Sequence, residues 1–385
     1  MPLNTYTSGF NKLKEEKSIN GEGDETKVSV PKLSTEEIVR IAGENYIQFC
    51  TQRIDDVYML THPYGSTFAS FSPEQAQDVE LAHFLLAATE KVGYQQFELA
   101  SRLLSRCEWL ASDTGNAVQR VVYYFSQALR ERIDRETGRF ISNGAEEKAK
   151  HYVAGQGCSN LVFLACHQML PFNQVMLFAG LQAILDSVAM ETKIHIIDFQ
   201  IRSGVQWTVL MQALAKRVVY RVECLKISAI VTADRKMVEE TGKRLTSVAA
   251  SLNIPFSFKD MKGLTAEHFD VQPREAVAVS SSIILRTMIW KPHCLENIIW
   301  VMRRFRPIIM VVTEVEANHN SPSFFNRFIE ALFFYSAFFH CLQDRTEGDN
   351  CYRMIVERTY FGEAIRNIVA AEGRERFNRS VNMRA

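Results

Sequence analysis

The stretch that decides the fold is Ile194–Phe199, with the sequence Ile-His-Ile-Ile-Asp-Phe, a short β-branched run that ends in an acid and a phenylalanine. A continuous apolar run of this length is typical of a strand that is buried on both faces of a sheet. A loop with a single glycine follows at 200–206, and a helix is predicted from Trp207 to Arg217. Strand, acid, loop and helix in this order open many nucleotide- and cofactor-binding sheets.

Four further apolar runs recur downstream, separated by stretches with a helical pattern: Cys224–Val231, Ile254–Phe258, Ala276–Val279 and Pro307–Val315. Strands that alternate with helices predict a parallel, doubly wound sheet. The sequence therefore predicts an α/β protein whose Rossmann-like, mostly parallel sheet has five strands.

The region upstream of the sheet is predicted to be helical. A helix begins at Ser72-Pro73-Glu74, where serine can act as the cap and proline takes the first helical position. From there to about Arg135, apolar residues at spacings of three and four predict amphipathic helices, and a second helical block, 146–189, is broken by Pro171. The simpler interpretation of the leucine stripes, which include Leu81 and Leu85, is a bundle core; the alternative is a face that binds a partner helix.

The domain plan follows from these changes in pattern. Residues 1–31 are polar and are expected to form a disordered tail. Residues 32–190 form the N-terminal helical cap, either as a unit of its own or as one unit with the core. The Rossmann-like core is placed at 191–376, and 377–385 is set apart as an atypical C-terminal end.

Composition limits the classes of partner. Lysine plus arginine and aspartate plus glutamate both number 44, so we expect contact with DNA to be indirect at most. The cysteines occur singly, without CxxC or zinc spacing, which predicts no metal site and a reducing compartment. No signal-peptide stretch and no apolar run of about 18 residues is present, so no membrane association is expected.

Catalysis is not predicted. Dinucleotide and S-adenosylmethionine sites need glycines where the backbone approaches the ligand, but Gln200 and Arg202 precede the one glycine, Gly204. There is no GxSxG or HExxH motif, so no catalytic residue and no cofactor is expected. We expect Asp198 to accept hydrogen bonds from the following loop and His195 to be a hydrogen-bonded core histidine. The alternative is a small-molecule-binding or methyltransferase-like protein with a pocket above Asp198, Gln200 and Gly204.

Several blocks, in order, resemble the plant GRAS family of transcriptional regulators. Ile194–Phe199, followed by Gly204-Val205-Gln206-Trp207 and Leu210–Leu214, resembles the VHIID block of that family. The helical stretches 76–135 and 146–190 resemble the leucine-rich regions on either side of it. Residues 307–337 and 367–373 resemble the PFYRE region. The resemblance covers about residues 35–376 and is closest to the DELLA-related branch, although 1–31 has neither the DELLA nor the TVHYNP signature.

The resemblance implies a fold like that of class I methyltransferases, with a helical cap and without the methyltransferase site. It also implies nuclear transcriptional regulation in plant development or hormone signalling, with the cytoplasm as a second location. The implied partners are DNA-binding transcription factors and other GRAS-like proteins, in homo- or heterodimers. The candidate contact residues are Leu81, Leu85, His195, Ile196, Ile197, Asp198, Gly204, Gln206, Trp207, Pro307, Phe328 and Tyr335.

The resemblance also has departures. The sequence shows Gly362-Glu363-Ala364 where the family often has Arg-Glu, and the family's SAW block is expected beyond Ala385. A C-terminally truncated chain is therefore one expectation, with Pro307–Val315 as an exposed sheet edge and a dominant-negative, partner-sequestering role as the alternative function. The phenylalanine-rich helix that contains Phe328 and Tyr335 is expected to pack on the sheet.

Overall fold

The computed structural model describes residues 33–52, 71–139, 160–230, 235–261, 271–345 and 350–382, so the predicted tail at 1–31 lies outside the described residues. The chain divides into two compact units, which we treat separately. The helical unit comprises 1–141, 321–348 and 364–371. The sheet unit comprises 142–320, 349–363 and 372–385.

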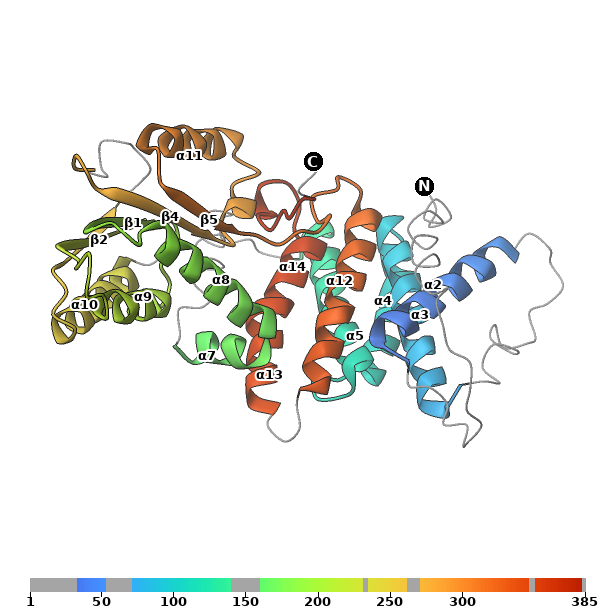
Figure 1. The fold of residues 1–385 in the computed structure, drawn as a ribbon. Helices are drawn as coiled ribbons and strands as arrows, with labels where there is room; N and C mark the ends of the chain where they lie inside the picture. Colours follow the sequence, from blue (N-terminus) through green and yellow to red (C-terminus); the bar gives the residue numbers. More distant parts are fainter. Residues whose placement is uncertain are drawn as a thin grey trace, which may run out of the picture. The chain divides into compact units, whose positions relative to one another are not determined.

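The sheet unit contains one five-stranded sheet in which every neighbouring pair is parallel. The strand order is β3-β2-β1-β4-β5, with β1 at the centre (Figure 1). Along the chain, the strands are added on one side of β1 as far as β3 and on its other side from β4 onward. This order matches the first five strands of the Rossmann arrangement and confirms the predicted fold class. The strands are β1 (Lys193–Asp198), β2 (Cys224–Ile230), β3 (Phe256–Met261), β4 (Ala276–Ser282) and β5 (Ile309–Thr313).

The central strand is buried because helices cover both faces of the sheet. Ile194 and Ile196 belong to one core with α8 (Pro171–Ser187), α9 (Val205–Ala215) and α10 (Arg235–Ser251). Ile197 belongs to a second core beneath α11 (Pro292–Phe305). Figure 1 shows α11 on one side of the sheet and α8, α9 and α10 on the other. Burial on both faces explains why isoleucine occurs at positions of β1 that face opposite sides of the sheet, Ile196 and Ile197.

Residues 146–159 of the second predicted helical block lie outside the described residues. The rest of the block lies in the sheet unit as two helices, α7 (Asn160–Met169) and α8. Leu170 is extended and Pro171 starts α8, which confirms the predicted break. Among the described residues, no single helix is long and apolar enough to cross a membrane; α7 and α8 meet that criterion only as a pair bent by 100°. The unit also contains η4 (Leu285–Thr287), α13 (Asn350–Val356), the π-helical turn η5 (Glu357–Gly362) and η6 (Gly373–Glu375).

The helical unit is built from helices whose starts are set by local sequence. Ser72 caps α3 with the predicted proline at the first position, and Gln75 completes the capping box. Asn116 and Gln119 form the same arrangement at α5. The helices are α2 (Thr35–Gln52), α3 (Pro73–Gly93), α4 (Phe97–Leu110), α5 (Ala117–Glu136), α12 (Phe324–Asp344) and α14 (Glu363–Ala370).

The division of the structure differs from the expected boundary at residue 190 in two respects. Helices α7 and α8 belong to the sheet unit, and α12, which follows the last strand in sequence, belongs to the helical unit. There α12 contacts α2, α3 and α5, so the expectation that it packs on the sheet is also wrong. Periodicity shows that a helix has an apolar face, but it does not show which other segment covers that face.

The C-terminal segment that the sequence set apart at 377–385 is packed as far as the structure describes it. Phe377, Asn378 and Ser380 are buried. The backbone carbonyl of Ser380 accepts from the His319 amide at 3.0 Å, and the Arg376 guanidinium donates to the His319 carbonyl at 3.0 Å. These residues therefore form part of the sheet unit.

Candidate functional site

Open α/β sheets usually bind ligands at the carboxyl ends of the strands, at the point where the order of the strands reverses. In this sheet that point is the end of β1. Asp198 occupies this position and is buried. Its Oδ1 accepts from the Gln200 amide at 2.9 Å. Its Oδ2 accepts from the Trp207 indole Nε1 at 2.7 Å and from the Gln206 side chain at 3.4 Å. Asp198 thus joins the strand, the following loop and the first turn of α9. The bond from the Gln200 amide is the bond to the loop backbone that the sequence predicted.

The pKa of Asp198 is set by its burial, by its hydrogen bonds and by the nearby Arg202. Burial raises the pKa of Asp198 to about 6, while the bonds from Gln200 and Trp207 and the nearby Arg202 act in the opposite direction. The bonds that Asp198 accepts from Gln200, Gln206 and Trp207 hold the loop and α9 to the end of the strand.

Gly204 is required by the conformation of the same loop. Its φ is +61°, in the left-handed region, and a Cβ at this position would lie 2.8 Å from Cγ2 of Thr241. The glycine therefore allows the loop to approach α10. Gly204 thus serves packing within the chain. In a dinucleotide site, by contrast, such a glycine allows the backbone to approach phosphate.

The rest of the loop is also bonded to α10. Thr241 donates to the Arg202 carbonyl at 3.0 Å, and the Arg244 guanidinium donates to the Ser203 carbonyl. Phe199 and Ile201 are buried. Asp198, Gln200 and Gly204 are themselves buried. A ligand pocket above these residues stays a prediction.

His195 lies on β1 with its ring in the interior. Its Nδ1 is 3.2 Å from Oε2 of Glu275 and its Nε2 is 2.8 Å from Oγ of Ser228 on β2. Both ring nitrogens thus have partners, which confirms the prediction of a hydrogen-bonded core histidine.

Most of the residues predicted to contact partners are instead part of a core. Leu81 and Leu85 of α3 are buried in the helical unit, which fits the simpler interpretation of a bundle core and not the alternative of a contact face. Phe328 and Tyr335 of α12 are buried beside Phe125. In the sheet unit the core residues are His195, Ile196, Ile197, Asp198, Gly204 and Trp207, and only Gln206 and Pro307 are partly exposed. These motif residues therefore contribute to the packing of the fold.

An apolar surface that the sequence did not single out lies on α7 and α8. We call it the α7–α8 surface; its exposed residues are Leu161, Leu164, Phe172, Val175 and Phe178. The opposite face of α8, with Leu181 and Ile184, packs on the sheet. The available signal was that the apolar residues of α8 are spread over several sides of the helix and do not form one stripe.

Comparison with known proteins identifies the class. The model of the GRAS domain family matches residues 81–385, a range that includes the segment 377–385 set apart by the sequence. This chain belongs to the GRAS domain family.

Its relatives within the family include DELLA proteins. DELLA protein RGA of Arabidopsis thaliana is 30% identical over 317 residues, covering 79% of this chain and 51% of that protein. DELLA protein 1 of Medicago truncatula is 29% identical over 326 residues, covering 79% of this chain and 52% of that protein. The chain thus spans about half the length of these relatives, and it fits the DELLA-related branch.

A solved structure has the same fold. The crystal structure of SCL7 in Oryza sativa aligns with a TM-score of 0.65 at 26% identity, covering 79% of this chain and 82% of the other.

Proposed function

We propose that this chain is a transcriptional regulator in plant development or signalling that acts in the nucleus through contacts with DNA-binding transcription factors. Membership of the GRAS domain family and similarity to DELLA proteins support this proposal. The balanced charge of 44 basic and 44 acidic residues supports an indirect connection to DNA. Other GRAS-like proteins are the second class of partner.

The observation that carries the proposal is a contrast within the sheet unit. The end of β1, where a related fold would bind its small ligand, is held together by Asp198, Trp207 and the bonds from α10. In the same unit the α7–α8 surface presents large apolar side chains. Contiguous exposed apolar groups on a folded protein are typical of a protein interface.

The α7–α8 surface has the geometry of a helix-binding face. Phe172, Val175 and Phe178 follow one another at a spacing of three and so lie on one side of α8. Val175 is 66% exposed and Phe178 is 70% exposed. Since the opposite side of α8 is fixed to the sheet through Gly180, which lies close to Val311, the helix offers a rigid platform. We propose this surface as the principal contact with partner proteins.

The proposal is tested with full-chain protein and a defined panel of DNA-binding transcription factors. Val175→Lys and Phe178→Lys place charge on the surface without touching the core. Val218→Lys is the matched control, because Val218 is exposed in the α9–β2 connection of the same unit. We expect the first two variants to lose binding and reporter regulation while the control keeps both. Equal binding by all three would contradict the assigned surface, and a chain that alters no reporter would contradict the regulatory function.

A further inference from the structure

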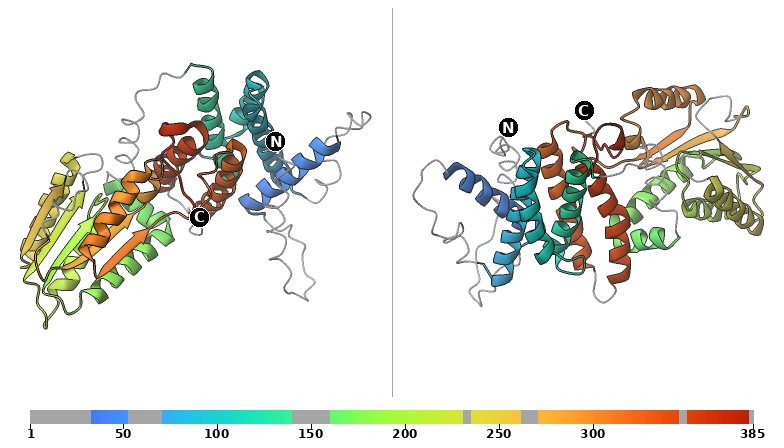
Figure 2. Two further views of the ribbon diagram at one scale, coloured as in Figure 1. Left: turned by 90° about the horizontal axis from the view of Figure 1, so that it is seen from above. Right: turned by 180° about the vertical axis from the view of Figure 1, so that it is seen from behind.

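Strand β5 forms one edge of the sheet, on the side opposite the other edge strand, β3 (Figure 2). In the part of the chain that the structure describes, β5 pairs with β4 alone, in parallel register. The backbone groups on its outer side therefore have no strand partner among these residues. An edge of this kind can accept a further strand. We call β5 together with Ile308 the β5 edge.

The β5 edge is covered on one face and exposed on the other. Ile309 and Val311 pack against the core on the α8 side of the sheet. The alternate residues Ile308, Met310 and Val312 are 46%, 40% and 45% exposed. Among the described residues, the core beneath α11 takes in β1 and β4 and stops short of β5. Strand β5 thus presents an unpaired edge and an exposed apolar face together.

The two edges of the sheet differ in their chemistry. On β3 the exposed positions hold Ser257 and Lys259, and Oδ2 of Asp260 is 3.1 Å from Nε of Arg235. Polar and charged residues of this kind keep an edge strand from pairing with another chain. Strand β5, in contrast, has no charged residue within Ile309–Thr313. An apolar, uncharged edge is the one that a further strand can cover without burying unpaired charge.

Opposite charges lie at the two ends of the β5 edge. Arg306 caps the end of α11 and precedes the strand, and Glu316 follows the strand. Both are exposed, and neither forms an ion pair with another described residue. Two copies of the edge paired in parallel would place Arg306 beside Arg306. An antiparallel pair about a twofold axis at Val311 places Arg306 opposite Glu316, since both lie at the same sequence distance from the axis. The charges are therefore complementary to a second copy in the antiparallel orientation.

The same arrangement also matches the exposed apolar side chains. With the axis at Val311, Met310 of each copy lies opposite Val312 of the other, on the face that α11 leaves uncovered. Apolar cross-strand pairs stabilise antiparallel ladders. An antiparallel strand beside an otherwise parallel sheet is common in α/β proteins. The backbone groups on the outer side of β5 gain partners at the same time, so the sheets of the two copies become continuous.

We propose that the β5 edge is a self-association surface, on which a second copy of this chain pairs antiparallel to form a twofold dimer. The contact is isologous, so it closes after two copies and does not propagate. The surface belongs to the sheet unit and is separate from the α7–α8 surface. The inference therefore does not depend on the proposed function.

The test follows the mass of the full chain by sedimentation velocity over a series of protein concentrations. We expect a reversible equilibrium between monomer and dimer. Met310→Lys and Val312→Lys should each raise the dissociation constant of the dimer by about tenfold or more, because each introduces two ammonium groups into the paired edges. Ser257→Lys on β3 is the matched control and should leave the dissociation constant unchanged. Circular dichroism verifies folding, and either β5 variant provides the test if the other does not fold.

Charge reversal tests the orientation of the two strands. Arg306→Glu and Glu316→Arg should each weaken the dimer by about threefold to tenfold, because each places like charges opposite one another. The double variant should restore the dimer, since the pair is then complementary again. A monomer at every concentration, open-ended aggregation, or a dimer that Met310→Lys and Val312→Lys leave unchanged would overturn the proposal. A double variant weaker than both single variants would overturn the antiparallel pairing.

Discussion

Trp207 donates its indole N–H to Oδ2 of Asp198 over 2.7 Å, and both side chains are buried at the end of β1. The bond joins the last residue of the central strand to the first turn of α9. It therefore fixes the strand–loop–helix unit that opens the sheet. The Gln200 amide donates to the other carboxylate oxygen, so both oxygens of Asp198 accept hydrogen bonds within this corner.

Asp198→Asn should destabilise the chain. An amide has only one acceptor oxygen, so either the Trp207 indole or the Gln200 amide loses its partner in the interior, at a cost of about 1–3 kcal/mol. Chemical denaturation followed by tryptophan fluorescence measures this change. Asp186→Asn removes an acid from the exposed side of α8 and should have little effect. A stability equal to that of the unsubstituted chain would show that the Asp198 bonds are dispensable.

Gly204→Ala should cost stability for two reasons that can be separated. The left-handed conformation opposes a side chain, at about 1–2 kcal/mol, and the added methyl would also meet Thr241. Gly138→Ala is the comparison, because Gly138 has a φ of +72° and open space around it. We expect the larger loss of stability at Gly204. Equal losses at the two positions would mean that contact with α10 contributes nothing.

Leu85→Ala should destabilise the helical unit by about 2–5 kcal/mol, since Leu85 is fully buried and its removal leaves a cavity. Leu99→Ala on α4 is the control, because Leu99 is 48% exposed and should change stability by less than about 1 kcal/mol. Thermal unfolding by circular dichroism compares the two. If Leu85 were a partner contact, its replacement would leave the fold intact, and similar melting temperatures for both variants would support that interpretation.

Asp78 should contribute to the pH dependence of stability. Its pKa is raised to about 6 in the folded chain from 3.8, so the folded state binds this proton more tightly. The contribution is fully present below about pH 3.8 and is lost as the pH rises through 6. Asp78→Asn removes this dependence. The stability of the variant relative to the unsubstituted chain should therefore increase between pH 4 and pH 7 in denaturation curves, and a constant difference would contradict the raised pKa.

The local chemistry of the sequence was sufficient to predict the central strand and the starts of helices. The isoleucine-rich run at 194–197 indicated burial on both faces, and hence a parallel central strand with helices above and below. Pro171 broke the helical block and Ser72 started α3, because caps and prolines act on the residues next to them. The interior roles of Asp198 and His195 could be predicted because both lie within the strand pattern itself.

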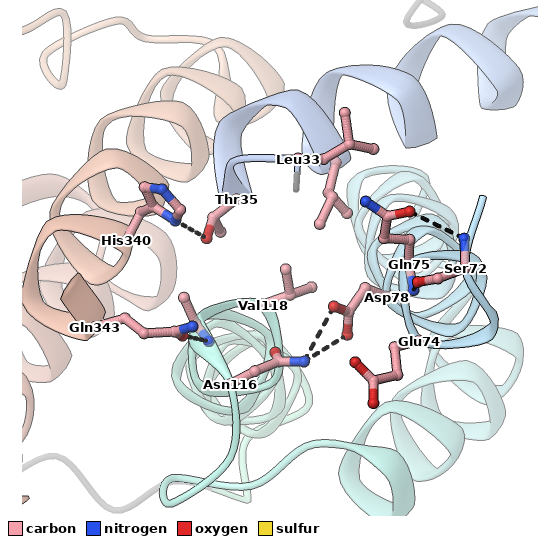
Figure 3. Close-up of a pocket in the computed structure, with 12 residues that line it drawn as sticks. Leu33, Thr35, Ser72, Glu74, Gln75, Asp78, Asn116, Val118, His340 and Gln343 are labelled. Carbon is pink, nitrogen blue, oxygen red and sulfur yellow. Dashed lines mark hydrogen bonds between the residues drawn. The ribbon is translucent and has the colours of Figure 1, made fainter. Parts of the chain in front are cut away.

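Tertiary structure decided which faces are covered. Leu85 and Phe178 both lie on apolar helical stripes, yet the first is fully buried and the second is 70% exposed. Periodicity is a property of one segment, whereas burial depends on which distant segment packs against it. For the same reason α12 could be predicted as a helix, but not as a member of the helical unit. A pocket lined by Asp78, Asn116 and His340 exists only because α2, α3, α5 and α12 are brought together, and no single stretch of the sequence contains it (Figure 3).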